Sequence, residues 1–438
     1  MPVFALVDCN NFYASCEKLF EPKLAHTPVV VLSNNDGCVV ARSAEVKALG
    51  IPMGVPWFKL REEAKRYGIV AFSSNYALYA DMSNRVVEVL EGFSPNLEVY
   101  SIDESFLSLD GFPPSTFEAY GRKIRERVDK WLGLAVCVGI GPSKTLAKLA
   151  NHCAKKNLAG SAGVCDFTRM RESELSDLFS RIDVGEVWGV GRKIDARLQD
   201  MGIRTVADLR NADAETVRTK FSVVLERTIR ELRGVSCLGL DEVVPDKQQI
   251  MCSRSFGERI YERSELGEAV ASYVSRAAEK LRKQKALASA LTVFVRTSPF
   301  NPKEPQYQKT LTVPLPEATD DTLELVGWGL RILKRIYRPG FAYQKAGCML
   351  SDIRPRSMAQ ASLFVPESDG RSESLMAAMD AINGRWGRGT MRVAAEGIDK
   401  AWRMKRGKLS PRYTTEWSEL PTVRAGQADP GLKNAGET

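Results

Sequence analysis

The sequence contains very little histidine and no long apolar run. Only His26 and His152 occur among its 438 residues, so we expect neither a metal site of several histidines nor a histidine proton relay. No apolar segment approaches the roughly 20 residues of a membrane-spanning helix, and residues 1–11 lack the basic start of a signal peptide. The nine cysteines include no C-x-x-C pair, which favours reduced thiols with a structural role. These absences predict a cytoplasmic protein that makes no membrane contact.

The charge of the chain is modest but unevenly placed. The composition of 44% hydrophobic and 26% charged residues is that of an ordinary globular protein, and the length indicates about three domains. The net charge is +8, and the excess of lysine and arginine grows toward the C-terminus. The later part of the chain would then bind a polyanion, and the first part would have another function. A basic protein with no polyanionic partner stays an open alternative at this point.

The first 168 residues alternate strands and helices without a regular βαβ period. Residues 3–7 form a continuous apolar run that predicts a buried strand and delivers Asp8 at its end. The pattern favours an α+β fold with residues 20–75 as an inserted subdomain. We predict further strands over residues 28–32, 97–109 and 135–140, and helices over 43–49 and 117–132.

Two further modules follow. Residues 169–240 are all-helical in pattern, and Gly189 and Gly191 enclose a turn that resembles a helix-hairpin-helix, whose backbone amides can hold a DNA phosphate. An ordinary helix–helix turn would look the same. Residues 250–352 predict the order strand, helix, strand, strand, helix, strand of a split βαβ module. The expected elements are residues 250–256, 265–285, 289–297, 309–315, 321–337 and 344–351.

Basic side chains accompany the split βαβ module. Arg254 and Arg296 lie on expected strands, beside a helix with several basic residues on its polar face. We interpret the set as a surface that tracks phosphate, although a plainly solvated face would show the same pattern. From about residue 353 the chain is rich in Gly, Ser and Arg, which predicts a tail with little core of its own.

Three carboxylates are candidates for chemistry. Asp8 follows the first apolar strand, and Asp103 and Glu104 stand together in the β-rich stretch 97–109. Adjacent residues of a strand point to opposite faces, so Asp103 and Glu104 can reach one site only where the strand ends or bends. Carboxylates in apolar surroundings need a partner or a metal ion. With no histidine at hand, such a cluster is typical of ligands for Mg²⁺, and solvation at strand ends is the alternative.

The motifs around these carboxylates resemble those of the Y-family DNA polymerases. Residues 8–17, DCNNFYASCE, are similar to the family's first catalytic motif, and residues 100–106, YSIDESF, are similar to the second. The resemblance continues through residues 138–150 and the hairpin at 188–191, and it covers nearly the whole chain. The segments that most resemble the UmuC type, the catalytic subunit of bacterial DNA polymerase V, are residues 33–38 and 73–76.

The resemblance implies a metal-dependent active site. Asp8, Asp103 and Glu104 match the family's metal-binding carboxylates, with Asp103 and Glu104 as catalytic residues, and the backbone carbonyl of Cys9 matches a further ligand. Two Mg²⁺ ions about 3.5–4 Å apart are implied, which would assist the attack of a primer 3′-hydroxyl on a dNTP.

The resemblance also implies nucleotide-binding residues. Tyr13 matches the aromatic steric gate that excludes a ribose 2′-hydroxyl, with an ordinary core role as the alternative. Lys155 matches a basic residue that contacts the incoming triphosphate. Many relatives carry Tyr and Arg three residues apart in the finger segment, where this sequence has Ala44 and Lys47. Lys47 keeps the positive charge of an arginine but lacks the guanidinium that donates two parallel hydrogen bonds. We expect Arg42 to compensate for that loss.

A stripe of lysines is a candidate contact for DNA. Lys144, Lys148 and Lys155 are spaced so that they fall within about 40° of one another on a helix. This spacing predicts a row of lysines along one face of a helix that is packed against the rest of the fold, with Lys144 and Lys148 as DNA contacts. A merely solvated stripe would have the same spacing.

The segment 360–364, QASLF, resembles the short peptide with which bacterial polymerases dock on the sliding clamp. Gln360, Leu363 and Phe364 are the expected contacts, because apolar residues in a linker need a partner. An accidental Leu-Phe pair is the alternative.

The resemblance implies a right-hand polymerase without a proofreading domain. We expect error-prone, template-directed translesion DNA synthesis in the DNA damage (SOS) response, with primer-template DNA, dNTPs and the sliding clamp as partners. The UmuC type further implies a processed UmuD-like dimer and RecA. Two alternatives stay open: a non-catalytic DNA-binding factor, and another metal-dependent phosphoryl-transfer enzyme such as a cyclase with a related palm. The expected parts are a palm (1–19 and 76–168), fingers (20–75), a thumb (169–240), a little finger (241–352) and a tail (353–438).

Overall fold

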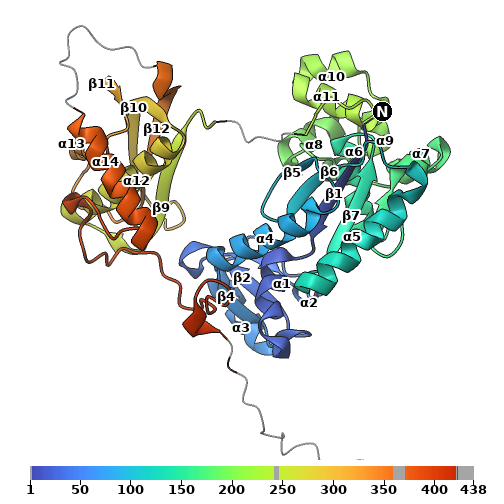
Figure 1. Cartoon of the computed structure of the whole chain (residues 1–438), viewed down its shortest axis with the longest axis horizontal. Coiled ribbons are helices and arrows are strands. Elements are labelled where there is room, and N and C mark those ends of the chain that lie inside the picture. Colours follow the sequence, from blue (N-terminus) through green and yellow to red (C-terminus); the bar gives the residue numbers. More distant parts are fainter. Residues whose placement is uncertain (1, 241–245, 359–369, 421, 423–438) are drawn as a thin grey trace, which may run out of the picture. The chain divides into compact units, whose positions relative to one another are not determined.

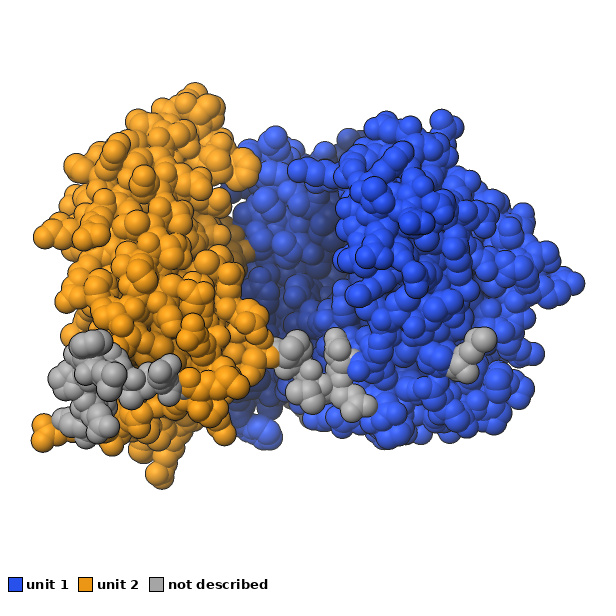
Figure 2. All heavy atoms as spheres, turned by 90° about the horizontal axis from the view of Figure 1, so that it is seen from above, with its two compact units in different colours: residues 1–33, 37–243, 408–438 blue, residues 34–36, 244–407 orange. Residues whose placement is uncertain are grey.

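The chain forms two compact units in a computed structural model that describes residues 2–240, 246–358, 370–420 and 422. The α+β class expected from the sequence is confirmed, and Figure 1 labels the elements. Each of the two units is larger than any of the five parts expected from the sequence, so that finer division stays a prediction. Unit 1 comprises Met1–Ser33, Gly37–Val243 and Lys408–Thr438, and unit 2 comprises Asn34–Asp36 and Val244–Gly407 (Figure 2).

A five-stranded sheet lies at the centre of unit 1. Its order is β5-β6-β1-β7-β8, so β1 is the middle strand, antiparallel to β6 and β7. Every residue of β1 is buried, as its unbroken apolar run predicts. Helices α1, α4 and α5 pack on one face of the sheet, and α6 packs on the other. The strands are β1 (Phe4–Cys9), β5 (Leu97–Val99), β6 (Glu104–Ser108), β7 (Val136–Gly141) and β8 (Val164–Asp166), and the helices are α1 (Phe12–Leu19), α4 (Tyr76–Glu91), α5 (Phe117–Leu132) and α6 (Lys144–Lys156).

A small second sheet in unit 1 has a core of its own. Its order is β3-β2-β4, with β2 antiparallel to β3 and parallel to β4. The buried side chains of β2 pack against those of the two helices that follow it in sequence. The elements are β2 (Val29–Leu32), β3 (Val39–Arg42), α2 (Ala44–Ala48), α3 (Trp57–Tyr67) and β4 (Val70–Ser73).

The segment after β8 is helical, as its sequence pattern predicts. Its apolar side chains share one core with the outer face of α6. The hairpin before α8 contains Gly189, whose φ of 89° lies in the left-handed region that favours glycine. The helices are α7 (Glu172–Ser180), α8 (Arg192–Asp200), α9 (Val206–Asn211), α10 (Ala214–Lys220) and α11 (Val223–Leu232).

Unit 2 is built on a four-stranded antiparallel sheet. Its order is β11-β10-β12-β9, with α12 and α13 packed on one face, which confirms the predicted split βαβ arrangement. The elements are β9 (Ile250–Ile260), α12 (Arg263–Lys283), β10 (Ala286–Thr297), β11 (Gln308–Thr319), α13 (Thr322–Ile336) and β12 (Tyr343–Pro355). Short 3-10 helices cover Pro22–Leu24, Asn34–Asp36, Pro114–Thr116, Phe167–Arg169, Val184–Glu186, Arg356–Met358, Ala394–Glu396 and Trp417–Glu419.

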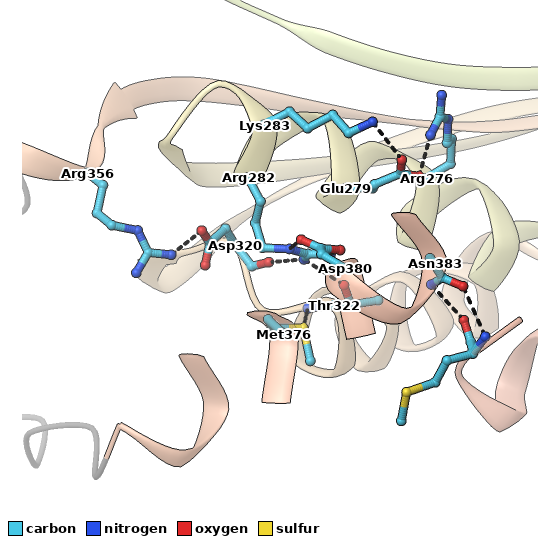
Figure 3. A network of polar contacts seen from close by, with 11 residues as sticks. Arg276, Glu279, Arg282, Lys283, Asp320, Thr322, Arg356, Met376, Asp380 and Asn383 are labelled. Carbon is cyan, nitrogen blue, oxygen red and sulfur yellow. Dashed lines mark hydrogen bonds and ion pairs between the residues drawn. The ribbon is translucent and has the colours of Figure 1, made fainter. Parts of the chain in front are cut away.

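The tail predicted after residue 353 requires a correction. Residues Arg371–Trp386 form helix α14, which a network of polar contacts fastens to α12 and α13 (Figure 3). The guanidinium of Arg282 donates to both carboxylate oxygens of Asp380, at 2.7 and 2.8 Å, and also to the Thr322 hydroxyl at 2.8 Å. Met376 is buried beneath this network. The segment has no separate core, as expected, but its side chains complete the cores of other parts of the chain.

The remaining residues of this segment also pack closely. Trp402 is buried in the core of unit 2, edge-on to Phe256 and Tyr273. From Lys408 onward the chain belongs to unit 1, where Tyr413 joins the core under the five-stranded sheet. The segment is rich in glycine, serine and arginine, so these few aromatic anchors are easily overlooked in the sequence.

The cysteines behave as the sequence predicts. All nine lie within the described residues, none forms a disulfide, and seven are buried. Among the described residues, no helix is both long enough and apolar enough to cross a membrane.

Candidate active site

The three candidate carboxylates meet at the end of β1. The antiparallel register places Asp8 directly opposite Glu104, the first residue of β6. The amide of Cys9 donates to the carbonyl of Asp103 at 2.9 Å, which ties the turn before β6 to the same point. The hydroxyl of Ser101 donates to Asp103 Oδ1 at 2.6 Å. Because the strand ends between Asp103 and Glu104, both side chains can reach one site, as the sequence argument required.

These carboxylates line one pocket together with basic and aromatic side chains. The pocket has a volume of about 470 Å³ and opens between the central sheet, α1 and the small sheet of unit 1. Its acidic residues face a set of cations from β3, α2 and α6. The lining residues are Asp8, Cys9, Asn11, Phe12, Tyr13, Val40, Ala41, Arg42, Lys47, Met53, Ile102, Asp103, Glu104 and Lys155.

Two lysines of α6 neutralise two of the carboxylates. Lys155 Nζ lies 2.5 Å from Asp8 Oδ2, and Lys148 Nζ lies 2.9 Å from both oxygens of Glu104. Burial raises the pKa of Asp8 to about 6, although Lys155 lowers it, and the nearby charges of Glu104 and Asp103 raise it further. The site thus concentrates negative charge that a cation stabilises.

The donor atoms of this site fit a hard divalent cation. In the described part of the chain, no three His, Cys, Asp or Glu side chains form a ready-made metal cage. Burial raises the pKa of the Cys9 thiol, which disfavours a thiolate at this position. The carboxylates of Asp8, Asp103 and Glu104 supply only oxygen, which Mg²⁺ prefers.

The cationic side of the pocket is formed by Arg42, Lys47 and Lys155. Arg42 Nη1 donates to the carbonyl of Ile51 at 2.5 Å, which holds its guanidinium at the pocket wall. Partial burial lowers the pKa of Lys47, and the charges of Arg42 and Lys155 lower it further. Three like charges held this close together favour a bound anion.

Tyr13 occupies the aromatic wall of the pocket. Its ring stacks on Tyr79 of α4, with ring centroids 4.2 Å apart and an interplanar angle of 15°. Tyr76 lies edge-on to Tyr13 at 6.4 Å. Nothing in the local sequence of Tyr79 or Tyr76 indicates a partner in α1, so these two contacts are not predictable from the sequence.

The expected DNA contact at Lys144 requires a correction. Lys144 is only 3% exposed, forms an ion pair with the buried Glu98 of β5, and lies over the ring of Phe106 at 5.1 Å. A side chain enclosed in this way does not reach a phosphate. Lys148 lies over the rings of Tyr100 and Trp188 and pairs with Glu104, so it belongs to the carboxylate site. Of the predicted stripe, Lys155 lines the pocket, Lys148 pairs with a carboxylate that lines it, and Lys144 supports the fold.

The remaining predicted DNA contacts are not among the residues that line the pocket. Gly189 and Gly191 precede α8, with Gly191 as its N-terminal cap residue. Arg254 pairs in register with Ala346, whereas Arg296 pairs with the next residue, Lys345, so the two arginines project from opposite faces of the sheet of unit 2. They do not form one continuous basic face, and Lys345, which the sequence argument overlooked, is the neighbour of Arg296. Gln360, Leu363 and Phe364 lie outside the described residues.

The fold is that of the Y-family DNA polymerases. A solved Y-family DNA polymerase chimera of Dbh and Dpo4 matches 80% of this chain and 99% of its own, with a TM-score of 0.63 and 19% sequence identity. The crystal structure of DinB from Sulfolobus solfataricus matches 80% of this chain and 98% of its own, with a TM-score of 0.51 and 19% identity.

Within this class, the chain belongs to the impB/mucB/samB family. The model of that family matches residues 7–152, and the model of the family's C-terminal domain matches residues 247–363. Protein UmuC of Salmonella typhimurium strain LT2 is 48% identical over 424 residues, which are 96% of this chain and 100% of UmuC. Protein ImpB of Salmonella typhimurium is 47% identical over 426 residues, 97% of this chain and 100% of ImpB. A further model, described as a domain of unknown function (DUF4113), matches residues 373–423.

Proposed function

We propose that this chain is a template-directed DNA polymerase that performs error-prone translesion synthesis in the SOS response. The observation that carries the proposal is the pocket in which Asp8, Asp103 and Glu104 face Arg42, Lys47 and Lys155. Family membership supports it, as do relatives named DNA polymerase IV, one of which, from Caulobacter vibrioides, is 26% identical over 388 residues. The reaction joins a primer 3′-oxygen to the α-phosphate of a dNTP and releases pyrophosphate.

The carboxylate side of the pocket would hold the metal ions. Asp8, Asp103, Glu104 and the Cys9 carbonyl are the proposed ligands of two Mg²⁺ ions, with Asp103 and Glu104 as the catalytic pair. Bound there, such ions neutralise phosphate charge and activate the attacking oxygen. Lys155 and Lys148 lie against two of these carboxylates and offset their buried negative charge.

The opposite side of the pocket would hold the nucleotide. The cationic groups of Arg42, Lys47 and Lys155 bind the triphosphate, and Lys47 provides charge without the bidentate geometry of an arginine. Tyr13 is the proposed steric gate, because its ring lies in the pocket wall beside the carboxylates. A 2′-hydroxyl would clash with that ring, so discrimination comes from repulsion.

Nucleic acid and protein partners complete the proposal. Backbone amides at Gly189 and Gly191 and the side chains of Arg254 and Arg296 are proposed to contact primer-template DNA. Residues 360–364 are proposed to dock on the sliding clamp, and similarity to the UmuC type supports a UmuD-like dimer and RecA as activating partners. An enzyme with these partners works on chromosomal DNA, in the nucleoid of the bacterial cytoplasm.

A primer-extension assay with the purified chain, Mg²⁺ and dNTPs tests the function. Asp103→Ala should abolish extension while leaving primer-template affinity within about twofold, since other parts of the chain hold the phosphates. Asp110→Ala, an exposed carboxylate outside the pocket, is the matched control and should extend normally. Normal extension by Asp103→Ala would refute the active-site assignment, and a wild-type chain that binds DNA without extending it would favour a non-catalytic DNA-binding factor.

A further inference from the structure

Tyr13 is held from behind by a side chain that does not line the pocket. Tyr79 is completely buried, and its ring covers one face of the Tyr13 ring at 4.2 Å. Tyr76 contacts both rings edge-on, at 6.4 Å from each. The position of the Tyr13 ring therefore depends on where α4 presents Tyr79.

Tyr79 is itself fastened to the helix that carries Tyr13. Its hydroxyl donates to Glu17 Oε1 at 2.5 Å. Glu17 lies four residues after Tyr13 on α1, so the two side chains share a face of that helix. Tyr13, Tyr79 and Glu17 thus form a closed circuit of contacts between α1 and α4, which restricts rotation of the Tyr13 ring.

Glu17 is an unusual anchor because it is a carboxyl group with only 1% exposure. Burial raises its pKa to about 7, while the hydroxyls of Tyr79 and Ser410 lower it. The second carboxylate oxygen, Glu17 Oε2, is buried and has no hydrogen-bond partner among the described residues. A buried carboxyl group destabilises the fold unless it is hydrogen-bonded, and the Tyr79 hydroxyl supplies that hydrogen bond here.

The residues 408–413, which we name the C-terminal strap, cover this circuit. Asn75 Nδ2 donates to Ser410 Oγ at 3.0 Å and to the Pro411 carbonyl at 3.2 Å. The same side chain caps α4, because its Oδ1 accepts from the amide of Leu78 at 3.3 Å. Tyr413 stacks on Phe20 with ring centroids 4.7 Å apart. The strap therefore fixes the first turn of the helix that presents Tyr79.

We propose that Tyr79 is a positioning residue for sugar selection, held by Glu17 and by the C-terminal strap, and that it acts through the ring of Tyr13. The proposal rests on the proposed role of Tyr13 as the steric gate. It also assigns a task to part of the domain of unknown function, since the strap lies within residues 373–423.

The test measures single-nucleotide insertion by the full-length chain and compares kcat/KM for a ribonucleotide with that for the matching deoxyribonucleotide. Tyr79→Leu removes the stacked ring and should raise this ratio about 2- to 12-fold, the equivalent of an aromatic pair worth about 0.5–1.5 kcal/mol. The rise should come chiefly from a lower KM for the ribonucleotide. Tyr79→Phe keeps the stack but loses the bond to Glu17, so its ratio should lie between those of Tyr79→Leu and the wild type. Glu17→Met removes the acceptor of the Tyr79 hydroxyl and should shift the ratio in the same direction.

Tyr120→Phe is the matched control. Tyr120 is a tyrosine of unit 1 whose hydroxyl also donates to a partner, the carbonyl of Phe93, but it lies outside the pocket lining. Its loss of a hydroxyl should leave the ratio unchanged. Wild-type ratios in folded Tyr79→Phe and Glu17→Met proteins would overturn the proposal, even where Tyr79→Leu fails to fold.

A double variant separates this inference from the role of Tyr13. If Tyr79 acts through Tyr13, then Tyr13→Ala with Tyr79→Leu should give the same ratio as Tyr13→Ala alone, whereas multiplying effects would overturn the proposal. Ser410→Ala should give a smaller rise than Tyr79→Leu, and an unchanged ratio would remove the share assigned to the strap. A wild-type ratio in Tyr13→Ala alone would refute the steric gate itself, and this proposal with it.

Discussion

Lys144 should matter for stability and not for DNA binding. Its ammonium pairs with the Glu98 carboxylate, and the two side chains are only 4% and 9% exposed. The ammonium also lies 5.1 Å above the ring of Phe106. Lys144→Met keeps the apolar stem and removes the charge. Glu98 then keeps its charge at a buried position but loses the ammonium of Lys144.

The expected loss follows from the depth of this ion pair. Breaking a buried pair from one side destabilises a fold by about 3–5 kcal/mol, whereas an exposed pair contributes at most about 1 kcal/mol. For a domain of this size the loss corresponds to a fall in Tm of about 6–20 °C. Replacing both partners, as in Lys144→Met with Glu98→Gln, should recover part of that loss because the Glu98 carboxylate is then removed together with its Lys144 partner.

Thermal unfolding and DNA binding decide between the two roles. Lys144→Met should melt at a lower temperature yet keep the salt dependence of primer-template affinity. Lys123→Met, an exposed lysine of α5, is the control and should change the unfolding free energy by no more than about 0.5 kcal/mol. The reasoning is refuted if Lys144→Met melts like the wild type while its plot of log K against log salt becomes shallower by about 0.9, the loss of one phosphate contact.

Three further predictions follow from buried or apolar groups. Because burial raises the pKa of Glu17 from 4.5 to about 7, its contribution to stability is complete below the lower value and is lost as pH rises through the higher one. The Tm of Glu17→Gln should therefore rise relative to the Tm of the wild type between about pH 5 and pH 8. A difference in Tm that stays the same over this pH range would contradict the assignment. Trp402→Ala should destabilise unit 2 by about 3–5 kcal/mol, as measured by limited proteolysis. If the variant resists the protease as well as the wild type does, residues 387–407 do not stabilise unit 2. Changing Leu363 and Phe364 to alanine should weaken clamp binding by roughly 1–3 kcal/mol per side chain but spare synthesis on short primers, and unchanged clamp affinity would leave the pair without a role.

The sequence predicted the elements whose signal is local. The unbroken apolar run of residues 3–7 was sufficient to place Asp8 at the end of a buried strand, because only a strand inside a sheet buries both faces. The order of strands and helices in residues 250–352 identified the split βαβ module without knowledge of its contacts. The convergence of Asp103 and Glu104 followed from the period of a strand and the place where it ends.

What the sequence left undetermined depends on contacts between distant residues. The spacing of Lys144, Lys148 and Lys155 predicts a common helix face, but whether that face meets solvent or a sheet depends on Glu98, which lies 46 residues before Lys144. Tyr79 is separated from Glu17 by 62 residues, so neither reveals the other. Patterns within one helix cannot report such partners, which are set by the packing of the whole unit.

The division of unit 1 along the chain has a consequence for what happens when the polypeptide is nicked. Apart from Asn34–Asp36, unit 2 is inserted between two segments of unit 1, since the chain leaves unit 1 after Val243 and returns to it at Lys408. A single proteolytic cut between residues 233 and 249 would produce two fragments that both contain part of unit 1. The second fragment would stay attached through the strap, whose serine is buried against the first fragment and whose tyrosine stacks on it. The nicked protein should therefore migrate as one particle in native conditions and come apart only in denaturant.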